Sequence, residues 1–371
     1  MPRLKACLHG GDIYGAAREL NRDLAEILDF SASINPLGPS SQVWKAIMAS
    51  RYLLSHYPDP HCWDLRQALA TFWRIDPEQI VVGNGSTELI DVLPRALGLH
   101  RLLVVQPTFS EYAAAMERAG GQVTALYSDR KDQYAIPIDR LCRLMKTGQS
   151  DGLSIDGIVI CHPNSPTGQA CSADDIARLA TIVRRQGLWL VIDEAFADYC
   201  PERSVLPQAA SWPHVVVLRS MTKFYALPGL RVGYAVATRT VAGRLRRQLP
   251  PWSISVMGQI AALAALSDAA HARKSLRFMT GERERLKGLF AALPGCSVLP
   301  TYANYFLMEL PRGWHARELT GQLRNEGLLV RDCSSVPGCN TRSIRLAVRS
   351  PQENDRLIQA LSNLLHHEVL Q

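Results

Sequence analysis

Six short apolar runs, separated by stretches with helical patterning, constrain the fold of this chain more than any other feature. They are IVVG, RLLVVQP, GIVICHP, LWLVID, VVVLRS and RVGYAVA, and they lie between residues 80 and 237. Apolar strands that alternate with helices form a mostly parallel sheet that helices cover on both faces. We therefore expect an α/β fold in which residues 41–240 make a large domain around such a sheet.

The 371 residues exceed one ordinary domain. The first 40 residues end in a Pro/Gly-rich turn, NPLGP, and form an N-terminal arm that we expect to pack with a small domain. Residues 241–371 begin with a long helical region and continue with YFLMEL, LLVRDC, SIRLAV and a closing helix. We expect them to form a small α+β domain. The functional site should lie between the two domains, at the carboxyl ends of the large-domain strands.

A lysine follows one of the buried strands. Lys223 lies in SMTKFYALPGLRVGY, just after Ser220 and Thr222 and eight positions before Arg231. An ammonium at the end of a buried strand costs several kcal/mol unless it is paired or neutralised. Two hydroxyls and a guanidinium suit a phosphate, and a lysine beside an anion cradle is what pyridoxal phosphate requires. A surface lysine after a strand is the alternative.

A second segment, WLVIDEAFADY, ends an apolar run in Asp193 and Glu194. Carboxylates at the end of a parallel strand lie where open α/β sheets bind ligands. An ionised Asp193 against a pyridine nitrogen would keep the ring protonated, and such charge-assisted bonds contribute about 1.5–3 kcal/mol. A helix N-cap is the alternative role for an isolated aspartate.

Two further segments have the same strand-then-turn character. IVICHPNSPTGQ ends in a Pro/Asn/Gly turn, and IVVGNGSTELIDVL leads into a helix that opens on Ser86, Thr87 and Glu88. Backbone amides and hydroxyls at a helix start form an anion site. The second segment carries neither G-x-G-x-x-G nor G-K-[ST], so it is neither a dinucleotide fingerprint nor a Walker loop.

Together the four stretches resemble the fold-type I pyridoxal-phosphate enzymes, the aspartate aminotransferase superfamily, whose elements G-N-G-S, P-N-x-P-T-G, D-E-A-F and S-x-x-K occur here in the same order. The resemblance implies a large domain with a mostly parallel sheet and a small α+β domain. It implies that Lys223 binds pyridoxal 5'-phosphate covalently and moves protons at the substrate's α-carbon, and that Asp193 pairs with the pyridinium. The implied contacts of the cofactor phosphate are Gly85, Ser86, Thr87, Ser220, Thr222 and Arg231.

Three more cofactor contacts follow from the same resemblance. Tyr112, in PTFSEY, is implied to stack on the pyridine, and Tyr57, in HYPDP, to reach the phosphate of a neighbouring subunit. The second role requires a homodimer with shared active sites. The superfamily usually has Asn directly before Pro-Thr-Gly, but this chain has Ser165, with Asn164 before it. Either residue could contact the cofactor's phenolic oxygen, so this assignment stays open.

The two ends of the chain look more specifically like the threonine-phosphate decarboxylases of the cobalamin pathway. The similar segments are HGGDIYGAARELNRDLAEILDFSASINPLGPS and LLVRDCSSVPGCNTRSIRLAVRS. The resemblance implies decarboxylation of O-phospho-L-threonine to (R)-1-amino-2-propanol O-phosphate, so the partner is a small phosphorylated amino acid. The substrate-binding residues would be His9, Gly10, Ser33, Asn35, Arg331 and Arg345.

Residue types alone do not decide the reaction, because the same side chains support decarboxylation and transamination. A histidinol-phosphate-type aminotransferase is therefore the alternative. A non-catalytic sensor that binds pyridoxal phosphate is a remote alternative, since Lys223, Asp193 and Arg231 are all present. Arg345 could instead be a surface arginine at the end of a strand.

Composition indicates a cytoplasmic protein without nucleic-acid or membrane partners. The net charge of +7 is spread out, and its densest cluster, Arg244, Arg246 and Arg247, lies in a helical stretch with an apolar face. No apolar run reaches the ~18–20 residues of a membrane span, and the N-terminus lacks the apolar core of a signal peptide. Nine cysteines form no C-x-x-C pair, which is typical of reduced thiols, and we expect no metal site.

Overall fold

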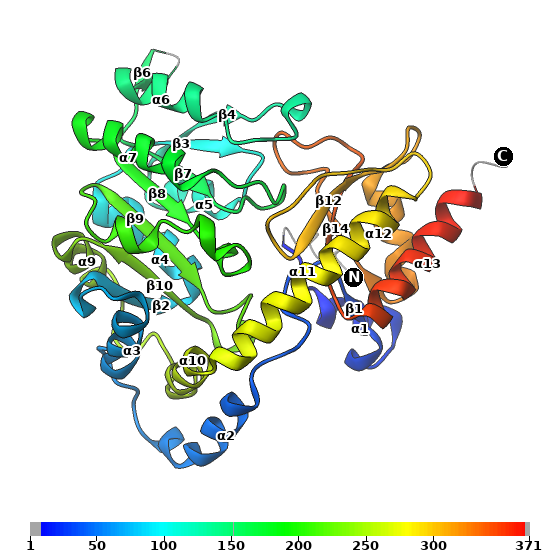
Figure 1. Cartoon of the computed structure of the whole chain (residues 1–371), viewed down its shortest axis with the longest axis horizontal. Helices are drawn as coiled ribbons and strands as arrows, with labels where there is room; N and C mark the ends of the chain where they lie inside the picture. Colours follow the sequence, from blue (N-terminus) through cyan, green and yellow to red (C-terminus); the bar gives the residue numbers. More distant parts are fainter. Residues whose placement is uncertain (1–8, 151, 368–371) are drawn as a thin grey trace.

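The computed structural model describes residues 9–150 and 152–367 and shows a large sheet beside a smaller α+β part (Figure 1). The large sheet has seven strands in the order β2-β10-β9-β8-β7-β3-β4. Strand β10 is antiparallel to both of its neighbours, and the other pairs are parallel. The predicted α/β fold is therefore confirmed. The strands are β2 (Ile80–Asn84), β3 (Arg101–Gln106), β4 (Gln122–Tyr127), β7 (Gly157–Cys161), β8 (Trp189–Asp193), β9 (Val215–Ser220) and β10 (Val232–Ala237).

Alternate residues of the central strands enter two different hydrophobic clusters. In β8, Leu190 and Ile192 belong to the cluster on one face and Val191 to the cluster on the other. This two-residue period, with every position apolar, is why both faces need a helical layer. The helices around the sheet are α2 (Ser41–Ala49), α3 (Trp63–Trp73), α4 (Gly85–Leu97), α5 (Glu111–Arg118), α6 (Ile138–Thr147), α7 (Ala173–Gln186), α8 (Leu206–Ala209), α9 (Arg239–Arg246) and α10 (Val256–Ser267).

One strand of the large sheet was not among the six apolar runs. Strand β4 lies at the edge of the sheet and pairs only with β3 in the described residues. Its sequence, QVTALY, places polar and exposed residues among the apolar ones because one long side of an edge strand faces solvent. A short hairpin, β5 (Gln149–Ser150) and β6 (Leu153–Ser154), lies apart from the large sheet.

The C-terminal part is built on a four-stranded antiparallel sheet in the order β11-β12-β15-β14. The N-terminal arm joins this part, because β1 pairs in parallel with β13. In addition, the amide of Ala347 donates to the carbonyl of Phe30 at 2.9 Å. The elements are α1 (Ile13–Leu20), β1 (Leu28–Asp29), α11 (Ala269–Ala291), β11 (Ser297–Val298), β12 (Tyr305–Glu309), α12 (Ala316–Asn325), β13 (Leu328–Leu329), β14 (Arg331–Asp332), β15 (Ser343–Ala347) and α13 (Pro351–His367).

The two helices that follow β10 pack on the large sheet, although most of their residues lie beyond position 240. Val241 and Leu245 of α9 belong to one of its hydrophobic clusters, and Ala261 and Ala265 of α10 belong to the other. The long helix α11, yellow in Figure 1, then runs across to the C-terminal part, whose cluster begins with Met279 along this helix. The division at residue 240 remains a prediction, and the packing favours one nearer the start of α11.

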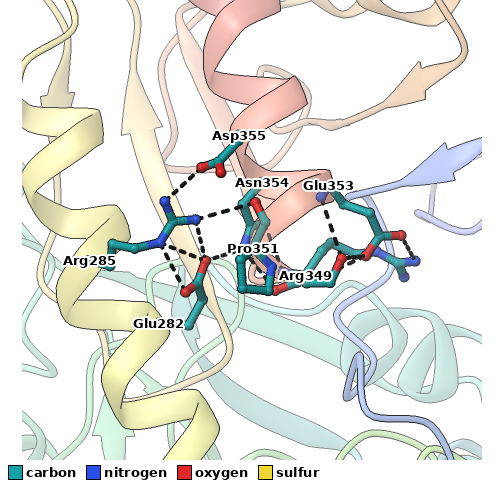
Figure 2. A network of polar contacts seen from close by, with 8 residues as sticks. Glu282, Arg285, Arg349, Pro351, Glu353, Asn354 and Asp355 are labelled. Carbon is teal, nitrogen blue, oxygen red and sulfur yellow. Dashed lines mark hydrogen bonds and ion pairs between the residues drawn. The ribbon is translucent and has the colours of Figure 1, made fainter.

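A polar network fastens α13 to α11 (Figure 2). Buried Glu282 accepts hydrogen bonds from Arg285 and from the side-chain amide of Asn354 at 2.7 Å. Arg349 donates to Glu353 at 2.6 Å, so its guanidinium is used within this network. The network lies directly after β15 and fixes the end of the strand that carries Arg345.

None of the helices in the described part of the chain has the length and apolarity that crossing a membrane requires. The same residues contain no group of three or more His, Cys, Asp or Glu side chains that could hold a metal ion. The eight described cysteines are all free thiols.

Candidate active site

The sheet topology brings the chemically interesting segments to one edge. Cys161 pairs with Asp193, and Asp193 pairs with Leu218, so β7, β8 and β9 end side by side. Strand β10 runs the opposite way and starts at this edge, which places Arg231 beside the end of β9. Strand β2 also ends here, and its last residue, Asn84, pairs with Val232.

A cavity of about 580 Å³ opens at this edge, between the large sheet and the C-terminal part. Of the sequence-predicted site residues, most line it: His9, Gly10, Ser86, Thr87, Tyr112, Ser165, Asp193, Ser220, Thr222, Lys223, Arg231, Arg331 and Arg345. They come from the arm, from five segments of the large domain and from two strands of the C-terminal part. The roles assigned to them remain predictions.

Lys223 lies in the cavity with a perturbed amine. Burial, together with the positive charges of Arg345 and Arg231, lowers its pKa from the ordinary 10.5 to about 8, and the carboxylate of Asp193 partly opposes this shift. A pKa near 8 makes the neutral, nucleophilic amine available close to physiological pH. The position of Lys223 in the chain, directly after a buried strand, is what encloses it.

Asp193 is 2 % exposed and is held by two hydrogen bonds. Its Oδ1 accepts from the amide of Ala195 at 3.0 Å, and its Oδ2 accepts from the hydroxyl of Tyr112 at 2.7 Å. Burial raises the pKa of this carboxyl, and the two hydrogen bonds oppose the rise. The side chain is therefore a fixed carboxylate that a protonated ring nitrogen or another cation would stabilise.

Hydroxyls, amides and one guanidinium form a cradle for an anion. Ser86 and Thr87 lie in the first turn of α4, and the hydroxyls of Ser220 and Thr222 are 2.7 Å apart. Arg231 lies so close to Gly85 that no other residue fits there: a Cβ at this position, where φ is +72°, would lie 2.6 Å from Nη2 of Arg231. A helix N-terminus with glycine at the close approach and a cation beside it is the arrangement that binds phosphate.

Two arginines face each other on neighbouring strands. Arg331 of β14 is the direct partner of Arg345 of β15, and both line the cavity. Like charges placed opposite each other destabilise an antiparallel pair. Arg345 is fixed by hydrogen bonds to Ser165 Oγ at 2.9 Å and to the carbonyl of Ser31 at 2.7 Å. The pair places two positive charges in the cavity wall, and the contacts of Arg345 with Ser165 and Ser31 argue against a simple surface role for it.

Asn164 and Ser165, the two candidates for the contact with the cofactor's phenolic oxygen, have different surroundings. The side chain of Asn164 is buried and bonds to Thr108, Thr167 and the carbonyl of Pro107, all within 2.9 Å. Ser165 lines the cavity instead. The hydroxyl of Ser165 is therefore the group that a ligand in the cavity can reach, although its contact with a cofactor remains a prediction.

Four other predicted residues do not line the cavity either. Gly85 lies behind the guanidinium of Arg231. The amide of Asn35 donates to Ser275 at 2.8 Å and to the carbonyl of Phe224 at 2.9 Å, so it ties the arm to the Lys223 segment. Ser33 is 1 % exposed, and its Oγ has no hydrogen-bond partner in the described residues. Tyr57 is 82 % exposed and packs on Trp252, with ring centroids 5.0 Å apart.

Sequence reasoning missed several residues of the cavity wall. Glu111 immediately precedes Tyr112 in the segment PTFSEY, and its charge could have drawn attention to it. Ser31, whose carbonyl accepts a hydrogen bond from Arg345, belongs to DFSAS, a segment that carries the family resemblance but no separate signal of a site. Ser335, Val336 and Pro337 come from the loop between β14 and β15; they belong to the C-terminal segment that carries the resemblance, but none of them was singled out as a site residue.

Comparison with known proteins places this geometry in a family. The family model described as aminotransferase class I and II matches residues 25–361. The chain belongs to this family. Among curated members, the threonine-phosphate decarboxylase of Salmonella typhimurium is 34% identical over 359 residues, which are 96% of each chain. The histidinol-phosphate aminotransferase of Roseiflexus castenholzii is 32% identical over 356 residues, 94% of this chain and 92% of its own.

A solved structure of the aminotransferase class I and II fold gives the same picture. The L-threonine-O-3-phosphate decarboxylase of Porphyromonas gingivalis has a TM-score of 0.80 and 25% sequence identity, and the match covers 92% of this chain and 100% of that one. The family and fold predicted from the sequence motifs are therefore confirmed.

The lowered pKa of Lys223 predicts an unusual labelling profile. On protein stripped of bound small molecules, reductive methylation of Lys223 should rise with pH through about 8, because the neutral amine is the reactive form. An ordinary exposed lysine stays protonated up to about pH 10. Lys45, exposed on α2, is the internal reference in the same mass spectra. A Lys223 profile that coincides with that of Lys45 would contradict the perturbed amine.

Proposed function

We propose that this protein is a pyridoxal-phosphate-dependent enzyme that decarboxylates O-phospho-L-threonine to (R)-1-amino-2-propanol O-phosphate in cobalamin biosynthesis. The observation that carries the proposal is the facing pair Arg331 and Arg345 in the same cavity as Lys223. Such a pair suits a substrate with two anionic groups, since a guanidinium binds carboxylate or phosphate bidentately. The Salmonella and Porphyromonas relatives carry the names of this activity.

The described residues fit pyridoxal phosphate. The cradle of Ser86, Thr87, Ser220, Thr222 and Arg231 would hold its phosphate, Lys223 would bind its carbonyl carbon, and Asp193 would pair with its ring nitrogen. The tight approach at Gly85 supports an anion in the cradle rather than a side chain. When bound, this cofactor withdraws electrons from the α-carbon of the substrate amine.

The protein residues then decide which bond at the α-carbon breaks. The groups that hold the substrate orient its α-carbon and so select the reaction. In our proposal Arg331, Arg345 and His9 share the carboxylate and phosphate, and this hold would present the carboxylate as the group that is lost. Lys223 would deliver the proton that replaces CO₂ on the α-carbon.

A histidinol-phosphate-type aminotransferase is the second candidate, and the Roseiflexus relative favours it. Its substrate also carries an amine and a phosphate, so the same cradle and arginines could serve. The two activities differ in one requirement: transamination needs a keto acid to accept the amino group, whereas decarboxylation needs none.

The reaction type can be tested directly. The purified enzyme should release CO₂ from O-phospho-L-threonine without 2-oxoglutarate. Arg345→Ala should lower kcat/KM by a factor equivalent to ~2–5 kcal/mol of lost transition-state stabilisation, the usual cost of removing one partner of a desolvated charge pair. Arg317→Ala, at an exposed position of α12, is the control and should leave turnover unchanged. Glutamate-dependent amino transfer to imidazole-acetol phosphate, with phosphothreonine inert, would establish the aminotransferase instead.

We further propose a homodimer with shared active sites. Large apolar side chains are exposed along α2 and the short helix Arg51–Ser55 that follows it, and the most exposed of them are 58–82 % accessible. Trp44, Met48, Tyr52 and Leu54 lie on these helices, and Tyr57 comes two residues after the second. So many large apolar side chains exposed in one stretch of chain support an interaction surface there. Tyr57 would then reach the cofactor phosphate of the partner subunit.

Subunit complementation tests this sharing. Lys223→Ala removes the catalytic amine, and Tyr57→Phe removes a charge-assisted hydrogen bond of roughly 1.5–3 kcal/mol. Mixed after dissociation and reassociation, the two variants should recover part of the wild-type activity, because one site in each mixed dimer has both residues intact. Recovery no greater than the sum of the separate variants would show that Tyr57 does not act across subunits.

The remaining parts of the proposal concern location and partners. The free thiols of the described cysteines support a reducing compartment, so we propose a cytoplasmic enzyme. Its partner is a small phosphorylated amino acid, and no nucleic-acid or membrane partner is proposed.

A further inference from the structure

A second carboxylate lines the cavity and has no part in the reaction described above. In the described wall, the carboxylates are Asp193, which would pair with the cofactor ring, and Glu111. Glu111 is the first residue of α5, and its side chain is 18% exposed. A negative charge in a cavity for a substrate with two anionic groups would repel that substrate unless another group neutralised it.

One contact of Glu111 is with the N-terminal arm. Its Oε1 lies 2.9 Å from Nε2 of His9, a residue 102 positions earlier in the chain. His9 belongs to the arm, whereas Glu111 belongs to the large domain, so the contact joins two separate parts of the cavity wall. The imidazole also packs against Phe109, with ring centroids 5.5 Å apart.

Glu111 is held from its other side as well. Its Oε2 lies 3.5 Å from Nη2 of Arg118, which is seven residues further along the same helix, α5. Arg118 is itself fixed, because its Nε donates to Asp91 of α4 at 2.6 Å. The carboxylate is therefore clamped between an arginine of the large domain and the imidazole of the arm.

We propose that Glu111 is a positioning residue that turns His9 into the receptor for the phosphate of the substrate, a role that rests on the proposed substrate class. A carboxylate on one ring nitrogen fixes the orientation of an imidazole. In the proposed complex, Nε2 would donate to Glu111 and Nδ1 would donate to the substrate phosphate, since an imidazole held between two anions carries a proton on each nitrogen. Glu111 thereby selects phosphorylated amines without touching them.

The test measures selectivity for phosphate apart from turnover. Phosphoethanolamine carries the amine and the phosphate but no carboxylate that could be lost, and ethanolamine lacks the phosphate. Their affinities for the holoenzyme follow from the change in cofactor absorbance. Glu111→Ala should weaken phosphoethanolamine about tenfold, the usual effect of losing one hydrogen bond to a charged group. It should change ethanolamine less than twofold.

Two controls separate positioning from folding. Glu117→Ala, exposed on the same helix, should leave both affinities unchanged. In a His9→Ala background, Glu111→Ala should have no further effect, because Glu111 acts through the imidazole. Equal weakening of both amines, no change in either, or additive effects of the two substitutions would each overturn the proposal.

The outcome is independent of the reaction type. If the wild-type enzyme releases no CO₂ from phosphothreonine while Glu111→Ala still weakens phosphoethanolamine selectively, the proposed reaction is wrong and the role of Glu111 stands. If CO₂ is released and the selectivity is unchanged in the variant, the role of Glu111 is wrong and the reaction stands.

Discussion

The enclosure of one lysine amine opposite one carboxylate underlies the chemistry of this protein. Asp193 ends β8, and Lys223 comes shortly after the end of the neighbouring strand β9, so the sheet places both in the cavity wall. Burial lowers the pKa of the amine and raises that of the carboxyl, and each group's charge opposes the shift of the other. The amine of Lys223, with a pKa lowered to about 8, can therefore react, and Asp193 is a carboxylate that a cation would stabilise.

A buried charge network supports the same strand ends from behind. Arg219, beside Ser220, donates to Glu194 at 3.2 Å and to Asp198 at 2.9 Å. Burial raises the pKa of both carboxyls, and the guanidinium opposes this effect. A buried ion pair of this kind contributes little net stability, but breaking it is costly. Its main effect here is to fix positions. It holds the backbone of β8 and β9 where Asp193 and Ser220 face the cavity.

Local sequence was enough to predict the residues whose position depends on one strand and its following turn. Asp193, Lys223 and Arg231 belong to this group, as do the apolar strands, because burial on both faces leaves a continuous apolar signal. Edge strand β4 escaped because it is half exposed. Asn164 and Asn35 depend on partners far away in sequence: Thr108, 56 positions from Asn164, and Ser275, 240 positions from Asn35. The proposed role of Glu111 depends on His9 in the same way: its charge is visible in the sequence, but its contact with a residue 102 positions away is not.

The central claim is that Lys223 is the residue that binds pyridoxal phosphate. Borohydride reduction of the holoenzyme, followed by digestion and mass spectrometry, tests it most directly, since reduction makes a bond between amine and cofactor permanent. We predict a single cofactor-modified peptide that contains Lys223. Modification of another lysine, or no covalently attached cofactor after reduction, would contradict the account.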